Sequence, residues 1–373
     1  MIFLIDNPLI LLYSFAMKIL LVDDTMSGHH LYYIRSILTL PHEFVFFSSE
    51  TSPLLSCRQI KNEKLNFVPR KFGDWLHFIN EVKKAAESEQ VDCVHFLNGA
   101  LFYRFFGIGL GRLRKFHPII TFHVIRFNFI RNISLRNIFR HIRFGVTHTA
   151  LIEQQANSIG IKNIVHIEYP DFTQAMTCGS VDFPNLPKNV PIIAAIGGTR
   201  SDKGLDILLE SLCKVKSPFH LLIAGYKADF DETFITEHSQ SYSQNVTLML
   251  KYLTDDELLA CYNHANIIVL PYRLTFNGAS GPLTEGASRG KCIIGPSHGS
   301  LADIILSNHL GWTFESENTE SLAQVLDKAL SEPFVYDETA RHYRDVLSPK
   351  RFVEDYKDLY EKVGIKCPKL LFN

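Results

Sequence analysis

The residues best suited to chemistry lie late in the chain, where a strand, a loop of small residues and a helix follow one another. The apolar run 267–270 ends at a proline, which is typical of a buried parallel strand. The loop 277–281 contains only small or polar residues, and Pro282 then suits the first turn of a helix. The free N–H groups of such a loop and helix start can hold an anion or sugar hydroxyls.

Glu285 follows in the first turn of that predicted helix, close to any ligand that the loop holds. A carboxylate is a good acceptor for the hydroxyls of a sugar or a ribose. The alternative is a carboxylate that stabilises the start of a helix after an ordinary strand–helix loop. This stretch alone leaves both interpretations open.

A second glycine loop, 197–204, carries two cations three residues apart, Arg200 and Lys203. Two cations beside a helix start suit a diphosphate. The spacing matches neither the P-loop nor the glycine pattern of dinucleotide-binding folds. For this loop alone, a solvated Arg and Lys beside a helix start is the competing interpretation.

Length and composition indicate a globular protein of two domains. The chain has 373 residues, more than a single hydrophobic core usually holds. Its net charge of −1 gives no general attraction to nucleic acid, and no nucleic-acid partner is expected. Seven cysteines without a Cys-x-x-Cys pair indicate reduced thiols in a cytosolic protein.

Apolar runs alternate with helical patterns twice along the chain, which predicts an α/β protein with two doubly wound domains. In the first half, we expect strands at 18–22, 43–47, 65–68, 93–96, 119–123, 146–149 and 164–167, and helices that include 31–38, 75–88 and 151–159. In the second half, we expect strands at 192–196, 219–224, 246–250, 267–270 and from 292, and helices at 203–213, 231–239, 255–263, 282–289, 300–306, 316–330 and 349–363.

These elements divide the chain into five parts. They are an apolar extension at 1–16, a first domain at 17–170, a linker at 171–190, a second domain at 191–345, and a helix and tail at 346–373 that pack back toward the first domain. The extension lacks Lys and Arg and contains Asp6, which favours a misassigned start before Met17 over a short membrane-seeking segment. Two such domains place a ligand between the carboxyl ends of their sheets.

Taken together and in this order, the two glycine loops resemble those of one family. Gly-Gly-x-Arg-x-x-Lys-Gly-x-Asp at 197–206, Leu-Pro at 270–271 and Pro-Leu-x-Glu-Gly-Ala-x-x-Gly-Lys at 282–291 are similar to motifs of the retaining family-4 glycosyltransferases, or group 1. The resemblance is good over 191–329 and weaker over 17–169. It implies the GT-B fold, in which two Rossmann-like domains face a cleft, and a nucleotide-diphosphate sugar as donor substrate.

The resemblance also implies roles for single residues. Arg200 and Lys203 would bind the donor diphosphate and stabilise the departing nucleoside diphosphate, Glu285 would hold the ribose hydroxyls, and His123 would contact the donor sugar. These four are the expected catalytic residues. The other implied donor contacts are Gly28 and Gly198 near the diphosphate, Leu253 by its backbone at the base, Asn277, Gly278, Ala279, Ser280 and Gly281 at the sugar, and Leu283 and Thr284 at the phosphates.

Several residues depart from the family pattern. Asn277 stands where the family has the first Glu of its Glu-x7-Glu motif; it keeps a hydrogen-bonding side chain but loses the charge, which leaves the identity of the donor sugar open. Val124 replaces an acidic residue, and Lys251-Tyr252 replaces a Phe/Leu-Gly pair before the base contact. Asp229-Phe230-Asp231 has the form of a metal–diphosphate motif, but we interpret it as a helix cap and expect no metal or other cofactor.

The segment 101–145 is basic and rich in large apolar residues. No acidic residue lies between Asp92 and Glu153, whereas nine cations do: Arg104, Arg112, Arg114, Lys115, Arg126, Arg131, Arg136, Arg140 and Arg143. Such a segment suits an anionic membrane surface or an anionic acceptor. The alternative is a solvated helix face above core phenylalanines.

The sequence therefore predicts a retaining glycosyltransferase that moves a sugar from a nucleotide-diphosphate donor to a glycan or lipid-linked glycan. We expect it in the cytoplasm, with a peripheral position on the inner face of the membrane as an extension of that prediction. One alternative is a GT-B sugar-nucleotide epimerase, which would need further carboxylates for attack of water at the anomeric carbon. The other is a catalytically silent GT-B partner subunit, which the Asn277 departure makes plausible.

Overall fold

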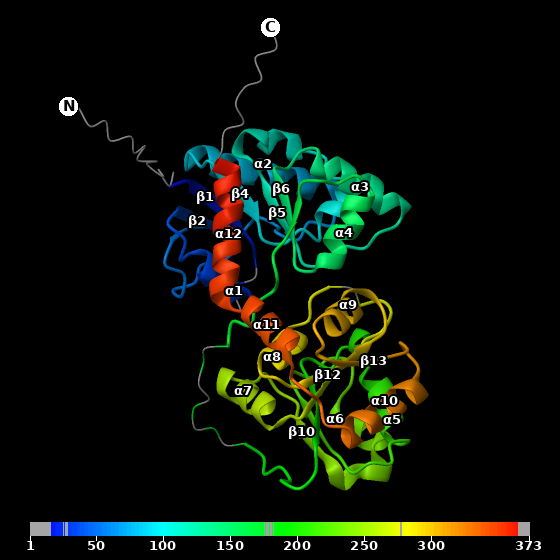
Figure 1. Cartoon of the computed structure of the whole chain (residues 1–373). Helices are drawn as coiled ribbons and strands as arrows, with labels where there is room; N and C mark the ends of the chain where they lie inside the picture. The colour runs from blue at the N-terminus through cyan, green and yellow to red at the C-terminus, as the bar shows by residue number, and fades with distance from the viewer. Residues whose placement is uncertain are drawn as a thin grey trace, which may run out of the picture.

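The computed structural model describes residues 16–24, 26, 29–174, 176, 179, 181, 183–276 and 278–364. Two predicted donor contacts, Gly28 and Asn277, lie outside the described residues, as do residues 1–15 of the expected extension and 365–373 of the expected tail. Figure 1 shows two bodies, one above the other, with the final helix (red) returning to the upper one.

The first domain is built on a parallel sheet of seven strands in the order β3-β2-β1-β4-β5-β6-β7. The strands are β1 (Lys18–Val22), β2 (Glu43–Ser48), β3 (Arg58–Lys61), β4 (Cys93–Phe96), β5 (Ile119–Phe122), β6 (Phe144–Thr147) and β7 (Ile164–His166). They alternate with α1 (His29–Ile37), α2 (Phe72–Ser88), α3 (Phe129–Phe139), α4 (Ala150–Ser158) and the short 3-10 helices η1 (Phe102–Phe105) and η2 (Leu110–Phe116).

The second domain repeats this plan with six parallel strands in the order β10-β9-β8-β11-β12-β13. The strands are β8 (Ile192–Ile196), β9 (His220–Ala224), β10 (Val246–Met249), β11 (Ile267–Val269), β12 (Cys292–Pro296) and β13 (Gly311–Phe314). The helices are η3 (Ser201–Lys203), α5 (Leu205–Leu212), α6 (Glu232–His238), η4 (Gln240–Asn245), α7 (Asp255–His264), α8 (Gly281–Ser288), α9 (Gly299–Ser307), α10 (Thr319–Ser331), α11 (Glu338–Val346) and α12 (Pro349–Gly364).

Both sheets are buried on their two faces, which explains why their strands are apolar runs and not alternating patterns. In β1, Leu20 and Val22 join the hydrophobic cluster on one face, whereas Ile19 and Leu21 join the cluster on the other. The predicted fold class, two doubly wound α/β domains, is confirmed.

One predicted strand is wrong. The stretch 65–68 is irregular, although Leu65 and Phe67 are buried. The Phe67 ring packs between Phe47 and Phe78, with ring centroids 5.3 and 5.7 Å apart. These residues fill the core from a loop, while the edge of the sheet is β3, which is only partly buried. The strands β3 and β13 and the helix α11 are not among the elements that the sequence pattern predicts.

The last helix connects the two domains. α12 follows α11 of the second domain and buries Phe352, Tyr356, Leu359, Tyr360 and Val363 in the cluster that covers β1. Inside that cluster, Tyr360 bonds His95 Nδ1 over 2.7 Å, and His95 Nε2 bonds Thr121 over 2.9 Å. The end of the chain thus completes the core of the first domain.

Candidate active site

A pocket opens at the carboxyl edge of the second sheet, between the ends of β8 and β11. Strand residues form its apolar floor, and its rim is lined by Gly197, Gly198, Thr199, Lys203, Pro271 and Tyr272. Gly197 has a φ of +113°, and a Cβ placed on it would lie 2.5 Å from the Lys203 ammonium nitrogen. Because other side chains are strained at this positive φ, glycine is favoured here, and its lack of a side chain leaves room for the lysine to fold over the loop.

The two predicted diphosphate ligands lie on this loop, but they are differently engaged. Arg200 forms a two-pronged ion pair with Asp202, with Nε to Oδ1 at 2.9 Å and Nη2 to Oδ2 at 2.7 Å. This hydrogen bonding lowers the pKa of Asp202 and raises that of Arg200. Lys203 lies 5.6 Å from the ring of Tyr272. For Arg200 to bind an anion through these two nitrogens, the Asp202 carboxylate would have to be displaced.

Arg273 holds the loop that carries Arg200 and Lys203, a role that the sequence does not indicate. Its Nε donates to Ser201 O at 2.9 Å, its backbone N–H to Asp202 O at 3.1 Å, and its Nη2 pairs with Asp206 at 2.5 Å. The contacts join residues far apart in the sequence, so the local pattern carried no signal for them.

The loop before α8 has the predicted form, but its amides are used differently. Ser280 is the N-cap of α8, and its hydroxyl accepts from Leu283 N–H at 3.4 Å. Thr284 N–H donates to Ser280 O at 3.1 Å, as in a regular helix. The amides of Leu283 and Thr284 thus make hydrogen bonds within the helix start, and their contact with the phosphates stays a prediction. Gly278, Ala279, Ser280 and Gly281 form the described part of the loop.

This loop meets the first domain at Gly278. A Cβ on Gly278 would lie 3.0 Å from the backbone oxygen of His123 and 3.0 Å from the Val124 side chain. Nearby, Arg126 Nη2 donates to Thr275 O at 3.0 Å. The predicted sugar contact His123 and the predicted sugar loop are thus neighbours across the domain interface.

His123 is neutral and its tautomer is fixed. Its Nε2 lies 2.9 Å from Leu97 O, and because a carbonyl only accepts, Nε2 carries the proton. Burial, followed by the nearby His30, lowers the pKa of His123 to about 4. Nδ1 therefore keeps its lone pair and can accept a hydrogen bond from a hydroxyl group. His30 itself pairs with Asp23 at 3.4 Å, and its ring centroid is 5.3 Å from that of His123.

Glu285 is 4% exposed and lies in the middle of α8. Burial and then the negative charge of Glu285 raise the pKa of both Tyr262 and Tyr169. The carboxylate thus lies among tyrosines of α7 and of the segment after β7.

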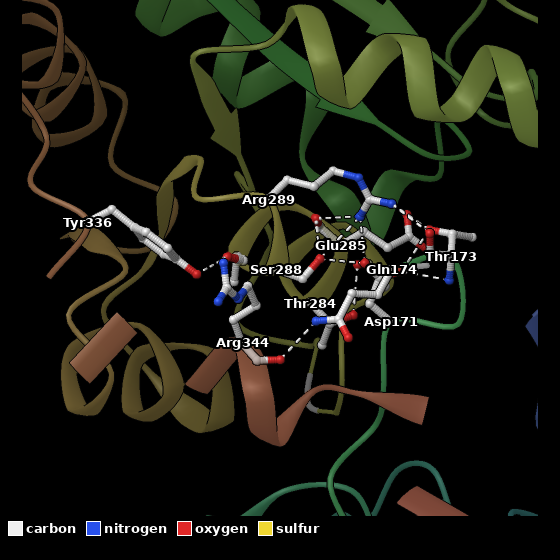
Figure 2. Close-up of polar contacts among 11 residues, drawn as sticks. Asp171, Thr173, Gln174, Thr284, Glu285, Ser288, Arg289, Tyr336 and Arg344 are labelled. Atoms are coloured by element: carbon white, nitrogen blue, oxygen red, sulfur yellow. Dashed lines mark hydrogen bonds and ion pairs between the residues drawn. The ribbon is translucent and has the colours of Figure 1, made fainter. Parts of the chain in front are cut away.

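The carboxyl end of α8 is anchored to the interdomain linker, as Figure 2 shows. Arg289 Nη1 pairs with the fully buried Asp171 at 2.5 Å, and Nη2 donates to Thr173 Oγ1 at 2.8 Å. Ser288 also donates to Asp171, and Gln174 Nε2 donates to Arg344 O at 2.9 Å. Sequence reasoning missed Asp171 and Arg289, because only the fold brings them together.

Leu253, the predicted base contact, lies in the loop between β10 and α7 and packs against the core of the second domain. The loop is held by a capping box: Glu257 N–H donates to Thr254 Oγ1 at 3.3 Å, and Thr254 N–H donates to the Glu257 carboxylate at 3.0 Å. The hydroxyl group of Tyr32, in α1 of the first domain, donates to the Asp255 carboxylate at the start of α7. This hydrogen bond raises the pKa of Tyr32 to about 12.

Asp229 and Asp231 act as structural caps. Asp231 accepts from Phe234 N–H at 3.0 Å at the start of α6, and Asp229 accepts from Ser201 N–H at 2.7 Å. This agrees with the helix-cap interpretation of the motif. Within the described residues, no group of three or more His, Cys, Asp or Glu side chains is placed to hold a metal ion.

The basic segment 101–145 combines cations that make structural contacts with a group of exposed apolar side chains. Arg136 donates to Ile159 O at 3.0 Å, Arg143 to Lys362 O at 3.3 Å, and Lys115 pairs with Glu87 at 2.8 Å. By contrast, the first turns of α3 expose Phe129 (81%), Ile130 (64%) and Ile133 (45%). In the described part of the chain, no helix is long and apolar enough to span a bilayer.

Comparison with known proteins finds one family model that matches the second domain. Residues 181–345 match the family model described as glycosyl transferases group 1. The second domain therefore carries the sequence pattern of that family. This match confirms the resemblance inferred from its two glycine loops. No curated protein matches the sequence.

Solved structures extend this assignment to the whole fold. A glycosyltransferase from Rickettsia africae ESF-5 is 19% identical, with a TM-score of 0.72 over 94% of this chain and 100% of that one. The lipopolysaccharide outer core galactosyltransferase WaaB is 14% identical, with a TM-score of 0.70 over 93% and 100%. Anabaena HepE, solved with UDP and glucose, is 11% identical, with a TM-score of 0.65 over 92% and 99%. At these identities the likeness establishes the fold, so the chain has the two-domain GT-B fold.

Proposed function

We propose that the protein transfers a sugar from a nucleotide-diphosphate donor to a glycan or lipid-linked glycan, with retention at the anomeric carbon. The observation that carries this proposal is the juxtaposition, in a group 1 fold, of the Arg200–Lys203 loop, the loop before α8 and His123. The first would bind a diphosphate, and the other two would flank the sugar attached to it.

The leaving group determines the chemistry that the site must supply. When the bond between the anomeric carbon and the phosphate oxygen breaks, negative charge develops on the departing diphosphate. Arg200 and Lys203 would stabilise that charge. Hydrogen-bond donors that are already in position before the reaction stabilise such a charge most effectively. Arg200 would exchange its bidentate bond to Asp202 for one to phosphate, which has matching geometry.

His123 would orient the sugar and not transfer a proton. With its pKa lowered to about 4 by burial, it stays neutral at physiological pH. Its unprotonated Nδ1 is an acceptor for one sugar hydroxyl, while Gly278 lets the loop approach the His123 backbone.

Two neighbours suggest substrates to test first. HepE was solved with UDP and glucose, and WaaB is a lipopolysaccharide core galactosyltransferase. A UDP-hexose donor and a cell-surface glycan acceptor are therefore the first candidates. We place the protein in the cytoplasm.

The exposed start of α3 supports a peripheral position at an anionic membrane. Phe129, Ile130 and Ile133 are large apolar side chains in water, and Arg131 and the exposed Arg104 of η1 lie on the same two packed elements. Apolar side chains flanked by cations favour the interface of an anionic bilayer. A lipid-linked acceptor would be presented there.

Donor turnover tests the proposal. Purified protein is incubated with UDP-glucose, UDP-galactose and other nucleotide sugars, and release of nucleoside diphosphate is followed with and without glycan acceptors. Arg200→Ala and Lys203→Ala should each lower turnover by about a hundredfold, as with other preorganised electrostatic donors. Lys357→Ala, in an exposed pair on α12, is the matched control. Near-normal turnover in both pocket variants would remove the assignment, and an inverted product anomer would remove retention.

A further inference from the structure

Two tyrosines stack at the outer part of the carboxyl edge of the second sheet. Tyr226 follows β9 and Tyr252 follows β10, with ring centroids 5.2 Å apart and planes 14° apart. Tyr252 is 83% exposed, the largest exposed fraction among the large apolar and aromatic side chains that the structure describes. An exposed aromatic ring is not unusual by itself, but this one is held parallel to a second ring.

Both rings are fixed by their surroundings. The ring of Tyr226 lies on Gly198, where a Cβ would approach it to 2.2 Å, and its backbone oxygen accepts from Thr199 N–H at 3.1 Å. Residues on either side of Tyr252 are held as well: Lys251 pairs with Glu257 at 2.5 Å, and Leu253 packs into the core. The exposed ring is therefore presented from a short, constrained loop, and little ordering would be needed to bind a ligand.

The position of the pair matches the order of groups in a nucleotide sugar. From the edge inward, the strands are β10, β9, β8 and β11, and parallel strands end at one edge. Tyr252 and Tyr226 follow the first two, the Arg200–Lys203 loop follows β8, and the loop that meets His123 follows β11. A flat base, a diphosphate and a sugar would meet these three features in that order.

The Tyr226–Tyr252 pair is also connected to the loop that carries Arg200 and Lys203. The Arg200 guanidinium lies beside Tyr226, and Thr199 O accepts from both Asp229 N–H and Phe230 N–H at 3.1 Å. The two loops thus form one unit, so a phosphate held at Arg200 places the attached nucleoside near the rings.

We propose that Tyr252, supported from behind by Tyr226, is the platform on which the nucleobase of the donor stacks. This inference rests on the proposed function, because it assigns the base subsite of the same donor. Tyr252 was noted in the sequence only as a departure from the family's Phe/Leu-Gly pair; the structure gives that departure a role. A stacking platform accepts any base through its π face, and it sets affinity more than base identity.

Calorimetry with two probes separates stacking from phosphate binding. UDP carries the base, whereas inorganic pyrophosphate carries only the charged part. Tyr252→Ala should weaken UDP binding by about tenfold or more, the range expected for loss of one base–aromatic stack. Pyrophosphate affinity should change less than about twofold, because no phosphate contact is removed. Tyr252→Phe should bind UDP like the wild type, since it keeps the ring.

Controls make each result decisive. Phe72→Ala removes a 48% exposed aromatic ring from the first domain and should leave both affinities unchanged. Thermal melting checks that the Tyr252 variants remain folded. UDP affinity that survives Tyr252→Ala, or an equal loss of UDP and pyrophosphate, overturns the platform while leaving the donor assignment intact. Wild type that binds none of UDP, CDP, GDP, ADP or dTDP overturns the donor assignment and the platform with it.

Discussion

At the scale of single residues, Asp202 controls how Arg200 can act. Its carboxylate occupies both prongs of the guanidinium, and it is a competitor for any phosphate. Asp202→Asn should strengthen pyrophosphate binding by about two- to fivefold, because a partly exposed ion pair of this kind contributes ~0.2–1 kcal/mol. Titration calorimetry measures the change, with Asp358→Asn on the surface of α12 as control. Weaker binding in Asp202→Asn would mean that the carboxylate positions Arg200 for the ligand.

The sequence predicts a role for residues that belong to a local pattern. Arg200 and Lys203 share one glycine loop, and a loop after a buried strand must lie at the carboxyl edge of the sheet. It did not reveal Arg273, which supports the same loop by contacts to Ser201, Asp202 and Asp206. Nor did it reveal that Ser280 would cap Leu283 N–H. Such contacts depend on where side chains lie after folding, and no spacing rule encodes them.

At the scale of secondary-structure elements, α8 connects the candidate site to the linker. Its first turn borders the loop that meets His123, and its end is fixed by the Arg289–Asp171 pair (Figure 2). Arg289→Met should lower the melting temperature by about 6–12 °C, because it leaves a buried carboxylate without its cation, at a cost of about 3 kcal/mol. Lys328→Met on α10 removes an exposed cation from a 3.8 Å pair and should change little.

The double variant Arg289→Met with Asp171→Leu completes that test. It removes both charges, so it should lose less than the sum of the two single variants. Additive losses would show that the two residues stabilise the fold independently.

Helices and strands are predicted correctly where the hydrophobic pattern fits only one structure. They are predicted wrongly where the same pattern fits both a strand and a buried loop. The buried strands β4 and β8 have the predicted bounds, because an apolar run with both faces covered leaves few alternatives. The stretch 65–68 alternates like a strand, yet Leu65 and Phe67 fill the core from a loop. The true edge strand β3, Arg58–Lys61, is polar and partly exposed, and its sequence resembles a loop.

At the scale of the whole molecule, the two domains are joined by more than the linker. Ser300 of α9 donates to Thr149 before α4 at 3.1 Å, Arg126 reaches Thr275, and α12 completes the core of the first domain. The helix α3, whose start is exposed and apolar, belongs to the first domain. The same domain contributes Arg126 and His123 to the border of the candidate site. If the start of α3 contacts a membrane, an acceptor in that membrane would approach the domain that carries His123.

Vesicle binding tests that arrangement. Arg104→Gln with Arg131→Gln should weaken binding to vesicles of phosphatidylcholine and phosphatidylglycerol by about thirtyfold, since each cation near an anionic surface contributes about 1 kcal/mol. Phe129→Ser with Ile130→Ser should also reduce binding, because it removes the exposed apolar side chains, and raised salt should mimic only the arginine variant. Leu306→Ser with Val335→Ser changes exposed apolar residues of the second domain and serves as the control. All three variants should keep UDP affinity, because none alters the candidate donor site. If wild type binds neutral and anionic vesicles equally, or neither, the exposed start of α3 is not a membrane contact and a water-soluble glycan becomes the acceptor to test.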